Sequence, residues 1–328
     1  MTMKRGLFIA AFALSLLVGL PGAQAQQAAG VYRIGFLGST SLSGYASQVE
    51  AFRRGLRDRG YFEGKNLVIE FRWAEAKYER LPELAAELVR LKPDVLVTHG
   101  PPGALAAKRA TDTIPIVVGV LGEAVAIGAV DSLARPGGNV TGLSFFVPEL
   151  NAKRLEVLKE AFPRLSRVGV LLKRDNPGNE PVLRAMRHTA QALKIQLQSV
   201  EVRTPGDLDN AVAAFVQGDA AAIAVHEEAM LIAQAERIAD LARKYQLPTI
   251  GFVEYARAGG LLALGVNFPD LWRRAAGTVD KVLKGTKPAD IPIEQATKFE
   301  LMVNMKTARS LGLTIPAAVL FRADHVIE

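Results

Sequence analysis

The chain has 328 residues, 49% of them hydrophobic, with a formal net charge of +7 and no cysteine. The absence of cysteine excludes disulfides, thiolate metal sites and a catalytic thiol. Basic residues are interleaved with acidic ones, as in Arg53–Arg59, so the charge is typical of solvated helix faces and does not indicate a nucleic-acid-binding surface.

The N-terminal segment, residues 1–25, has the pattern of a secretory signal peptide. Lys4 and Arg5 precede an uncharged, mostly apolar run from Leu7 to Leu20, and Ala23-Gln24-Ala25 then supplies the small residues that a signal peptidase reads. The apolar run is shorter than the roughly 20 residues of a membrane-spanning helix. We therefore expect cleavage after Ala25 and a soluble mature protein of charge about +5 in the periplasm. Without a cysteine at the cleavage site, a lipoprotein is excluded.

Short apolar runs alternate with longer amphipathic segments along most of the chain. The runs predict strands at Tyr32–Leu37, Leu67–Trp73, Val95–Thr98, Ile116–Val120, Val140–Leu143, Val168–Leu172, Ile195–Val202, Ala220–Val225, Pro248–Phe252, Leu261–Leu264 and Phe299–Asn304. The segments with helical spacing predict helices at Gln48–Arg59, Leu81–Leu91, Ala104–Arg109, Glu180–Leu193, Pro205–Val216, Glu228–Tyr245 and Asp270–Leu283. This alternation predicts an α/β fold with two doubly wound, Rossmann-like lobes of parallel strands, joined by a linker near Phe145–Leu150.

The sequence lacks the short motifs that carry enzyme chemistry. No Gly-x-Gly-x-x-Gly follows the first predicted strand, and neither a P-loop nor a Gly-x-Ser-x-Gly elbow is present. The four histidines, His99, His188, His226 and His325, do not pair at metal-ligand spacing. We therefore expect no catalytic residue, no metal and no cofactor.

The loops that follow the predicted strands are the candidate ligand-binding positions, because open α/β sheets bind ligands beyond the carboxyl ends of their strands. In the first series, hydroxyls follow the first strand, a Gly-Pro-Pro-Gly loop leads into a helix N-terminus suited to an anion, and an acid follows the fourth strand. In the second series, the amide of Asn176 follows the strand Val168–Leu172, and the acid Glu227 follows the strand Ala220–Val225. The candidates are Ser39, Thr40, Ser41, Gly100, Pro102, Gly103, Glu123, Asn176 and Glu227.

Each candidate also has a purely structural interpretation. The hydroxyls of Ser39–Ser41 and the turn at Gly100–Gly103 suit ordinary turn chemistry. Glu123 and Glu228 are equally placed to begin the helix that follows them. His226 is more often a structural hydrogen-bonding residue than a ligand contact in such a position.

Five segments have a distinctive sequence. They are Phe52–Asn66 (FRRGLRDRGYFEGKN), Ser132–Gly142 (SLARPGGNVTG), Trp272–Asp290 (WRRAAGTVDKVLKGTKPAD), Glu294–Asn304 (EQATKFELMVN) and Leu311–Glu328 (LGLTIPAAVLFRADHVIE). In this order they resemble the solute-binding components of ABC transporters, specifically the exported family labelled tryptophan/tyrosine-type substrate-binding proteins.

The resemblance implies a type 1 periplasmic-binding-protein fold with three segments crossing between the lobes. Lobe one would comprise residues 31–145 and 268–292, and lobe two residues 146–267 and 293–328. A ligand would bind in the interlobe cleft, hinge closure would follow, and the closed form would deliver the ligand to an ABC permease in the inner membrane. Such proteins have no catalytic residues, and a freely diffusing monomer is the expected state.

The sequence departs from the family pattern at cleft positions. Glu123-Ala124 aligns with the usual Asp-Pro, Leu264-Gly265-Val266 with an aromatic-Gly-Pro, and Gly100–Gly103 carries two prolines. The family's aromatic amino acids therefore do not transfer directly, and we expect a small polar or amino-acid-like ligand. Delivery to a sensory receptor instead of a permease is an open alternative, and a secreted α/β enzyme is a third interpretation that no motif supports.

Overall fold

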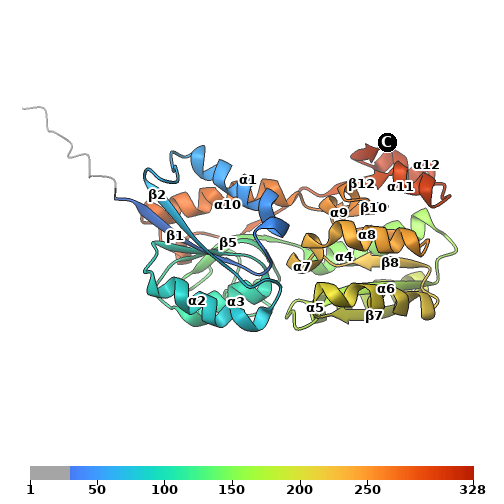
Figure 1. Ribbon diagram of the computed structural model, residues 1–328, viewed down its shortest axis with the longest axis horizontal. Helices are drawn as coiled ribbons and strands as arrows, with labels where there is room; N and C mark the ends of the chain where they lie inside the picture. The colour runs from blue at the N-terminus through green and yellow to red at the C-terminus, as the bar shows by residue number, and fades with distance from the viewer. Residues whose placement is uncertain (1–29) are drawn as a thin grey trace, which may run out of the picture. The chain divides into compact units, whose positions relative to one another are not determined.

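The computed structural model describes residues 30–328 of the chain (Figure 1). The predicted signal peptide lies outside the described residues. Residues 31–328 form one compact unit that contains two separate β-sheets. Among the described residues, no helix combines the length and apolar character needed to cross a membrane.

The first sheet has six strands, all parallel, in the order β11-β5-β4-β3-β1-β2. Its strands are β1 (Tyr32–Gly38), β2 (Leu67–Trp73), β3 (Val95–Thr98), β4 (Ile116–Gly122), β5 (Val140–Phe145) and β11 (Glu294–Gln295). The central strands β3, β4 and β5 are buried along their whole length, as parallel strands covered on both faces must be. The edge strand β2 is only partly buried and tolerates Glu70 and Arg72.

The second sheet has seven strands in the order β13-β12-β10-β9-β8-β6-β7, parallel except for the β10–β12 pair. Its strands are β6 (Arg167–Lys173), β7 (Gln196–Val202), β8 (Ala222–Val225), β9 (Thr249–Gly251), β10 (Leu262–Gly265), β12 (Glu300–Asn304) and β13 (His325–Ile327). The first five strands of each sheet therefore share one doubly wound order, which confirms the predicted fold class.

Helices cover both faces of the first sheet. They are α1 (Ala46–Arg57) and α10 (Phe268–Leu283), which pack against each other on one face, and α2 (Leu81–Arg90) and α3 (Gly100–Ala110), which pack together on the other (Figure 1). The second sheet is accompanied by α4 (Val147–Ala161), α5 (Asn179–Leu193), α6 (Leu208–Gln217), α7 (Ala229–Ala233), α8 (Ala235–Lys244), α9 (Val253–Arg257), α11 (Met305–Ser310) and α12 (Ala317–Arg322). Of these, α4 packs on α5 and contacts β8, β9 and β10.

The chain passes from one sheet to the other three times. It leaves the first sheet at Phe146, between β5 and α4, and returns through residues 266–267, between β10 and α10. The third passage runs through residues 296–299, between β11 and β12. The two sheets are therefore connected by three segments of the chain.

Three sequence predictions were wrong in detail. The helix predicted at Ala104–Arg109 begins earlier, because Gly100–Gly103 forms the first turn of α3, where a proline loses no hydrogen bond. The helix predicted at Glu228–Tyr245 is two helices, α7 and α8, separated at Gln234. The chain does cross between the sheets within the expected linker Phe145–Leu150, but this segment is not a loop, since only Phe146 lies between β5 and the unpredicted helix α4.

Candidate ligand-binding site

A cavity lies at the carboxyl ends of both sheets. About 630 Å³ among its lining residues is free of protein atoms, a volume that includes space open to solvent. In each sheet the strand order reverses beside the strand that begins the series, next to β1 in the first sheet and β6 in the second. Residues after β1, β3, β6 and β8 line the cavity, so it occupies the switch point of both sheets at once.

Six of the nine candidate residues line this cavity. They are Ser39, Gly100, Pro102, Glu123, Asn176 and Glu227. The structure places the other three next to it. The Ser41 hydroxyl accepts a hydrogen bond from the Gly44 backbone N–H at 3.1 Å, which is turn chemistry. A Cβ at Gly103 would lie 2.3 Å from Thr98 Oγ1, so this glycine is needed for packing of α3 against β3, and Thr40 is buried.

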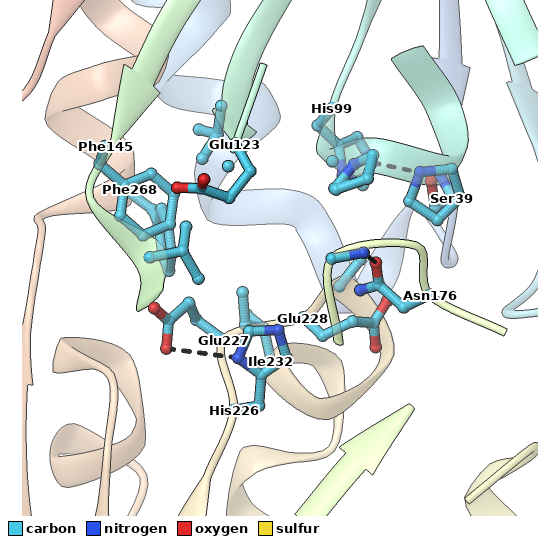
Figure 2. A pocket seen from close by; sticks show the side chains of 18 of the residues that line it. Ser39, His99, Glu123, Phe145, Asn176, His226, Glu227, Glu228, Ile232 and Phe268 are labelled. Atoms are coloured by element: carbon cyan, nitrogen blue, oxygen red, sulfur yellow. Dashed lines mark hydrogen bonds and ion pairs between the residues drawn. The ribbon is translucent and has the colours of Figure 1, made fainter. Parts of the chain in front are cut away.

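His99 and Ser39 form one side of the cavity (Figure 2). The Ser39 backbone N–H donates to His99 Nε2 at 3.2 Å, so the proton of a neutral imidazole lies on Nδ1. Burial lowers the pKa of His99 to about 3, which keeps the ring neutral at physiological pH. The ring stacks on Tyr45 with centroids 4.2 Å apart, and the buried Ser39 Oγ has no protein partner.

Asn176 supplies a polar group from the second sheet. Its Oδ1 accepts a hydrogen bond from the Gly178 N–H at 2.9 Å. The NH₂ group, which is the donor end of the amide, takes no part in this bond. The side chain is drawn on the same side of the cavity as Ser39 and His99 (Figure 2). This side therefore carries neutral hydrogen-bonding groups.

Glu123 occupies the opposite side of the cavity, with Phe145 and Phe268 (Figure 2). It follows β4 with a φ of 52°, a left-handed conformation that is uncommon for glutamate. Burial, and then the nearby Glu149 carboxylate, raise the pKa of Glu123 above its usual value. The rings of Phe145 and Phe268 are 5.9 Å apart in an edge-to-face arrangement.

Glu227 is held by a buried ion pair. Its Oε2 bonds Arg154 Nη1 of α4, and its Oε1 accepts a hydrogen bond from Asn151 Nδ2 at 3.0 Å. Both charged side chains are almost completely inaccessible to solvent. The negative charge of Glu227 is therefore balanced within the protein.

The neighbouring Glu228 has no such counter-ion. Its Oε2 accepts hydrogen bonds from the N–H groups of Met230 and Leu231, at 2.9 and 3.4 Å, and so caps α7. Burial raises the pKa of this carboxyl to about 8. The helix-capping interpretation of Glu228 is thus correct.

Sequence reasoning missed the aromatic lining. Tyr45, Tyr78, Phe145 and Phe268 all border the cavity. Phe145 lies two residues beyond the predicted strand Val140–Leu143 and could have been proposed on that ground, whereas Tyr45 and Tyr78 lie in short 3₁₀ helices without a sequence signal. Among residues 30–328, no group of three or more His, Asp or Glu side chains is arranged to hold a metal ion.

Comparison with known proteins gives consistent matches. Residues 37–327 match the family described as ABC transporter substrate binding protein. A tyrosine-binding protein of Clostridioides difficile is 26% identical over 265 residues, which cover 80% of this chain and 76% of that protein.

Two solved structures superpose over 90% of this chain and 99% of theirs. One is a conserved domain protein from Vibrio cholerae, with a TM-score of 0.84 and 26% identity. The other is an ABC domain in complex with L-Trp from Streptococcus pneumoniae, with a TM-score of 0.83 and 24% identity.

Proposed function

The chain belongs to the ABC transporter substrate-binding protein family, and from this premise we propose that it is the periplasmic solute-binding component of an ABC import system. It captures an amino-acid-like molecule between two lobes and delivers it to a permease of the inner membrane. The observation that carries the proposal is the cavity at the switch points of both sheets, lined from both sides. The protein is exported by cleavage after Ala25, acts as a monomer and catalyses no reaction.

In the proposed mechanism the lobes are built on the two sheets, residues 31–145 and 268–295 forming lobe one and residues 146–267 and 296–328 lobe two. Lobe one thus extends three residues beyond the predicted boundary at residue 292, because β11 pairs with β5. The three passages between the sheets act as the hinge. The ligand binds one lobe first, and closure follows when contacts with the second lobe offset its cost. Glu294–Gln295 pair with β5, which supports placing the third hinge segment at residues 296–299.

The candidate residues take separate roles. Ser39, Gly100 and Pro102 contact the ligand from lobe one, with Thr40, Ser41 and Gly103 shaping the backbone behind them. Glu123 faces a cationic or hydroxyl group of the ligand. Asn176 contacts the ligand from lobe two, and Glu227 contributes through its buried pair with Arg154.

The names of the relatives supply the first ligands to test, since they include a tyrosine-binding protein and a complex with L-Trp. The purified protein is unfolded and refolded to remove bound ligand, and its thermal unfolding is followed with tyrosine and tryptophan. A ligand at 100 times its dissociation constant stabilises the fold by about 2.7 kcal/mol. A shift supports solute capture, and the absence of any shift across amino acids and their analogues contradicts it. Loss of uptake of the same solute on deletion of the gene separates import from sensing.

A further inference from the structure

The cavity has an uneven balance of charge. Three acidic side chains line it, those of Glu123, Glu227 and Glu228, and no lysine or arginine of the described chain is among its lining residues. Glu228 keeps its proton at neutral pH, since burial raises its pKa to about 8, so Glu123 is the carboxylate without a counter-ion. Arg154 balances only Glu227. Lys173 is not among the lining residues; its Nζ lies 4.3 Å from the Tyr78 ring centroid and donates to the Arg174 carbonyl. A carboxylate removed from water without a counter-ion is costly, so a ligand that brings a positive charge is favoured.

The helix N-termini around the cavity offer little to an anion. A helix normally exposes four free N–H groups at its start. In α3 the residues at two of these positions are Pro101 and Pro102, which have no N–H. The start of α7 is occupied by the Glu228 carboxylate, and before α1 the Ser41 hydroxyl accepts from the Gly44 N–H.

The remaining helices that begin at the cavity are α4, α5 and α10, since Val147, Gly178 and Phe268 line it. Each has an acidic residue in its first turn, which offsets the positive end of the helix dipole. These residues are Glu149, Glu180 and Asp270. A ligand carboxylate would therefore meet weakened donors on all of these sides.

The two sides of the cavity suit different parts of a ligand. Glu123 lies with the rings of Phe145 and Phe268, a combination of carboxylate and aromatic faces that binds ammonium groups (Figure 2). Ser39 and His99 on the opposite side are neutral, and the unpartnered Ser39 Oγ suits a hydroxyl or an N–H group. Aromatic rings border both sides, with Phe145 and Phe268 beside Glu123 and Tyr45 stacked on His99, and they suit a flat apolar body.

We propose that the ligand is an arylalkylamine, with its ammonium group at Glu123 and an uncharged polar ring substituent toward Ser39 and His99, and that no ligand carboxylate is needed for binding. This inference rests on the proposed function and names the ligand class of the same site. It predicts that removing the carboxylate from an aromatic amino acid preserves or improves binding, whereas removing the amine abolishes it.

Three compounds with one phenol ring test the inference. Tyramine, tyrosine and 4-hydroxyphenylacetate are titrated calorimetrically into the full-length mature protein after refolding. We expect tyramine to bind at least as tightly as tyrosine, and 4-hydroxyphenylacetate at least about tenfold more weakly than tyramine, the scale of one charge-assisted hydrogen bond. If tyrosine binds and tyramine binds about tenfold more weakly, the inference is wrong while the proposed function stands. If the folded protein binds none of the three, both are rejected.

Two variants assign the ammonium position. Glu123→Gln keeps the shape of the side chain and should weaken the binding of tyramine at least about tenfold. The affinity for the neutral 4-ethylphenol should stay within about threefold of the wild-type value. Glu83→Gln is the matched control, because Glu83 is exposed and does not line this cavity, and it should leave both affinities unchanged. Equal tyramine affinity in the wild type and in Glu123→Gln, with both proteins folded by circular dichroism, would overturn the assignment.

Discussion

Replacing Arg154 by methionine should destabilise the protein severely. The guanidinium is fully buried and bonds four groups, the Glu227 carboxylate, Asn151 Oδ1 at 3.0 Å, the Leu264 carbonyl at 2.9 Å and the Val225 carbonyl at 3.5 Å. It thereby joins α4 to the carboxyl ends of β8 and β10. Methionine has a similar length, so the change removes the charge and the hydrogen bonds with little change in packed volume.

The expected loss follows from what remains after the change. Glu227, whose side chain is 1% exposed, would keep a buried charge with only Asn151 to bond it. Breaking a buried pair in this way costs about 3–5 kcal/mol, or roughly 6–10 °C in melting temperature for a chain of this size. The double variant Arg154→Met with Glu227→Gln leaves no charge behind and should recover at least about 2 kcal/mol of the loss.

Urea unfolding of the four proteins, followed by far-ultraviolet circular dichroism, measures these differences as a double-mutant cycle. Glu227→Gln alone should also destabilise, because Arg154 is then the unpaired charge. A loss below about 1 kcal/mol for Arg154→Met, or losses that simply add in the double variant, would refute the view that this pair is buried and mutually dependent.

Three further predictions concern stability. The difference in unfolding free energy between the wild type and Glu228→Gln should fall as pH rises from about 4.5 to about 8, by at most about 1.4 kcal/mol per pH unit, because the folded Glu228 carboxyl keeps a proton that the unfolded chain releases. A difference that does not change with pH would contradict it. Gly55→Ala should cost about 1–3 kcal/mol, since its Cβ would lie 2.4 Å from the Arg273 carbonyl where α1 meets α10. Gly277→Ala in α10 faces only the movable end of a side chain and should be neutral or stabilising by up to about 1 kcal/mol, so equal urea midpoints for these two variants would be evidence against the packing argument. Lys194→Gly should stabilise by about 0.5–1 kcal/mol, because this exposed residue ends α5 with a φ of 56°, whereas Lys194→Ala should leave the melting temperature nearly unchanged.

Most of the strand and helix order was readable from local periodicity, although the 15-residue helix α4 was not predicted. Leu67–Trp73 and Val95–Thr98 have the predicted bounds. Val95–Thr98 is a short β-branched run that suits a buried strand, and Leu67–Trp73 alternates apolar residues with Glu70 and Arg72, as a partly buried edge strand does. The alternation of these runs with helices is sufficient to predict parallel sheets, since parallel strands require crossover connections. The same rule placed the candidate residues at strand ends, and six of them line one cavity.

The composition of the site depended on the tertiary structure. Arg154 and Glu227 are 73 residues apart in sequence and meet only because α4 packs across the strand ends of the second sheet. Phe145 and Phe268 come together because the chain leaves the first sheet after β5 and returns to it at α10. A local pattern of apolar residues indicates which face of a helix or strand is buried. It does not indicate which side chains from distant elements come into contact, because that depends on how the elements pack. The sequence by itself therefore determined the strand ends where a ligand can bind, and the tertiary structure decided which charges there remain unbalanced.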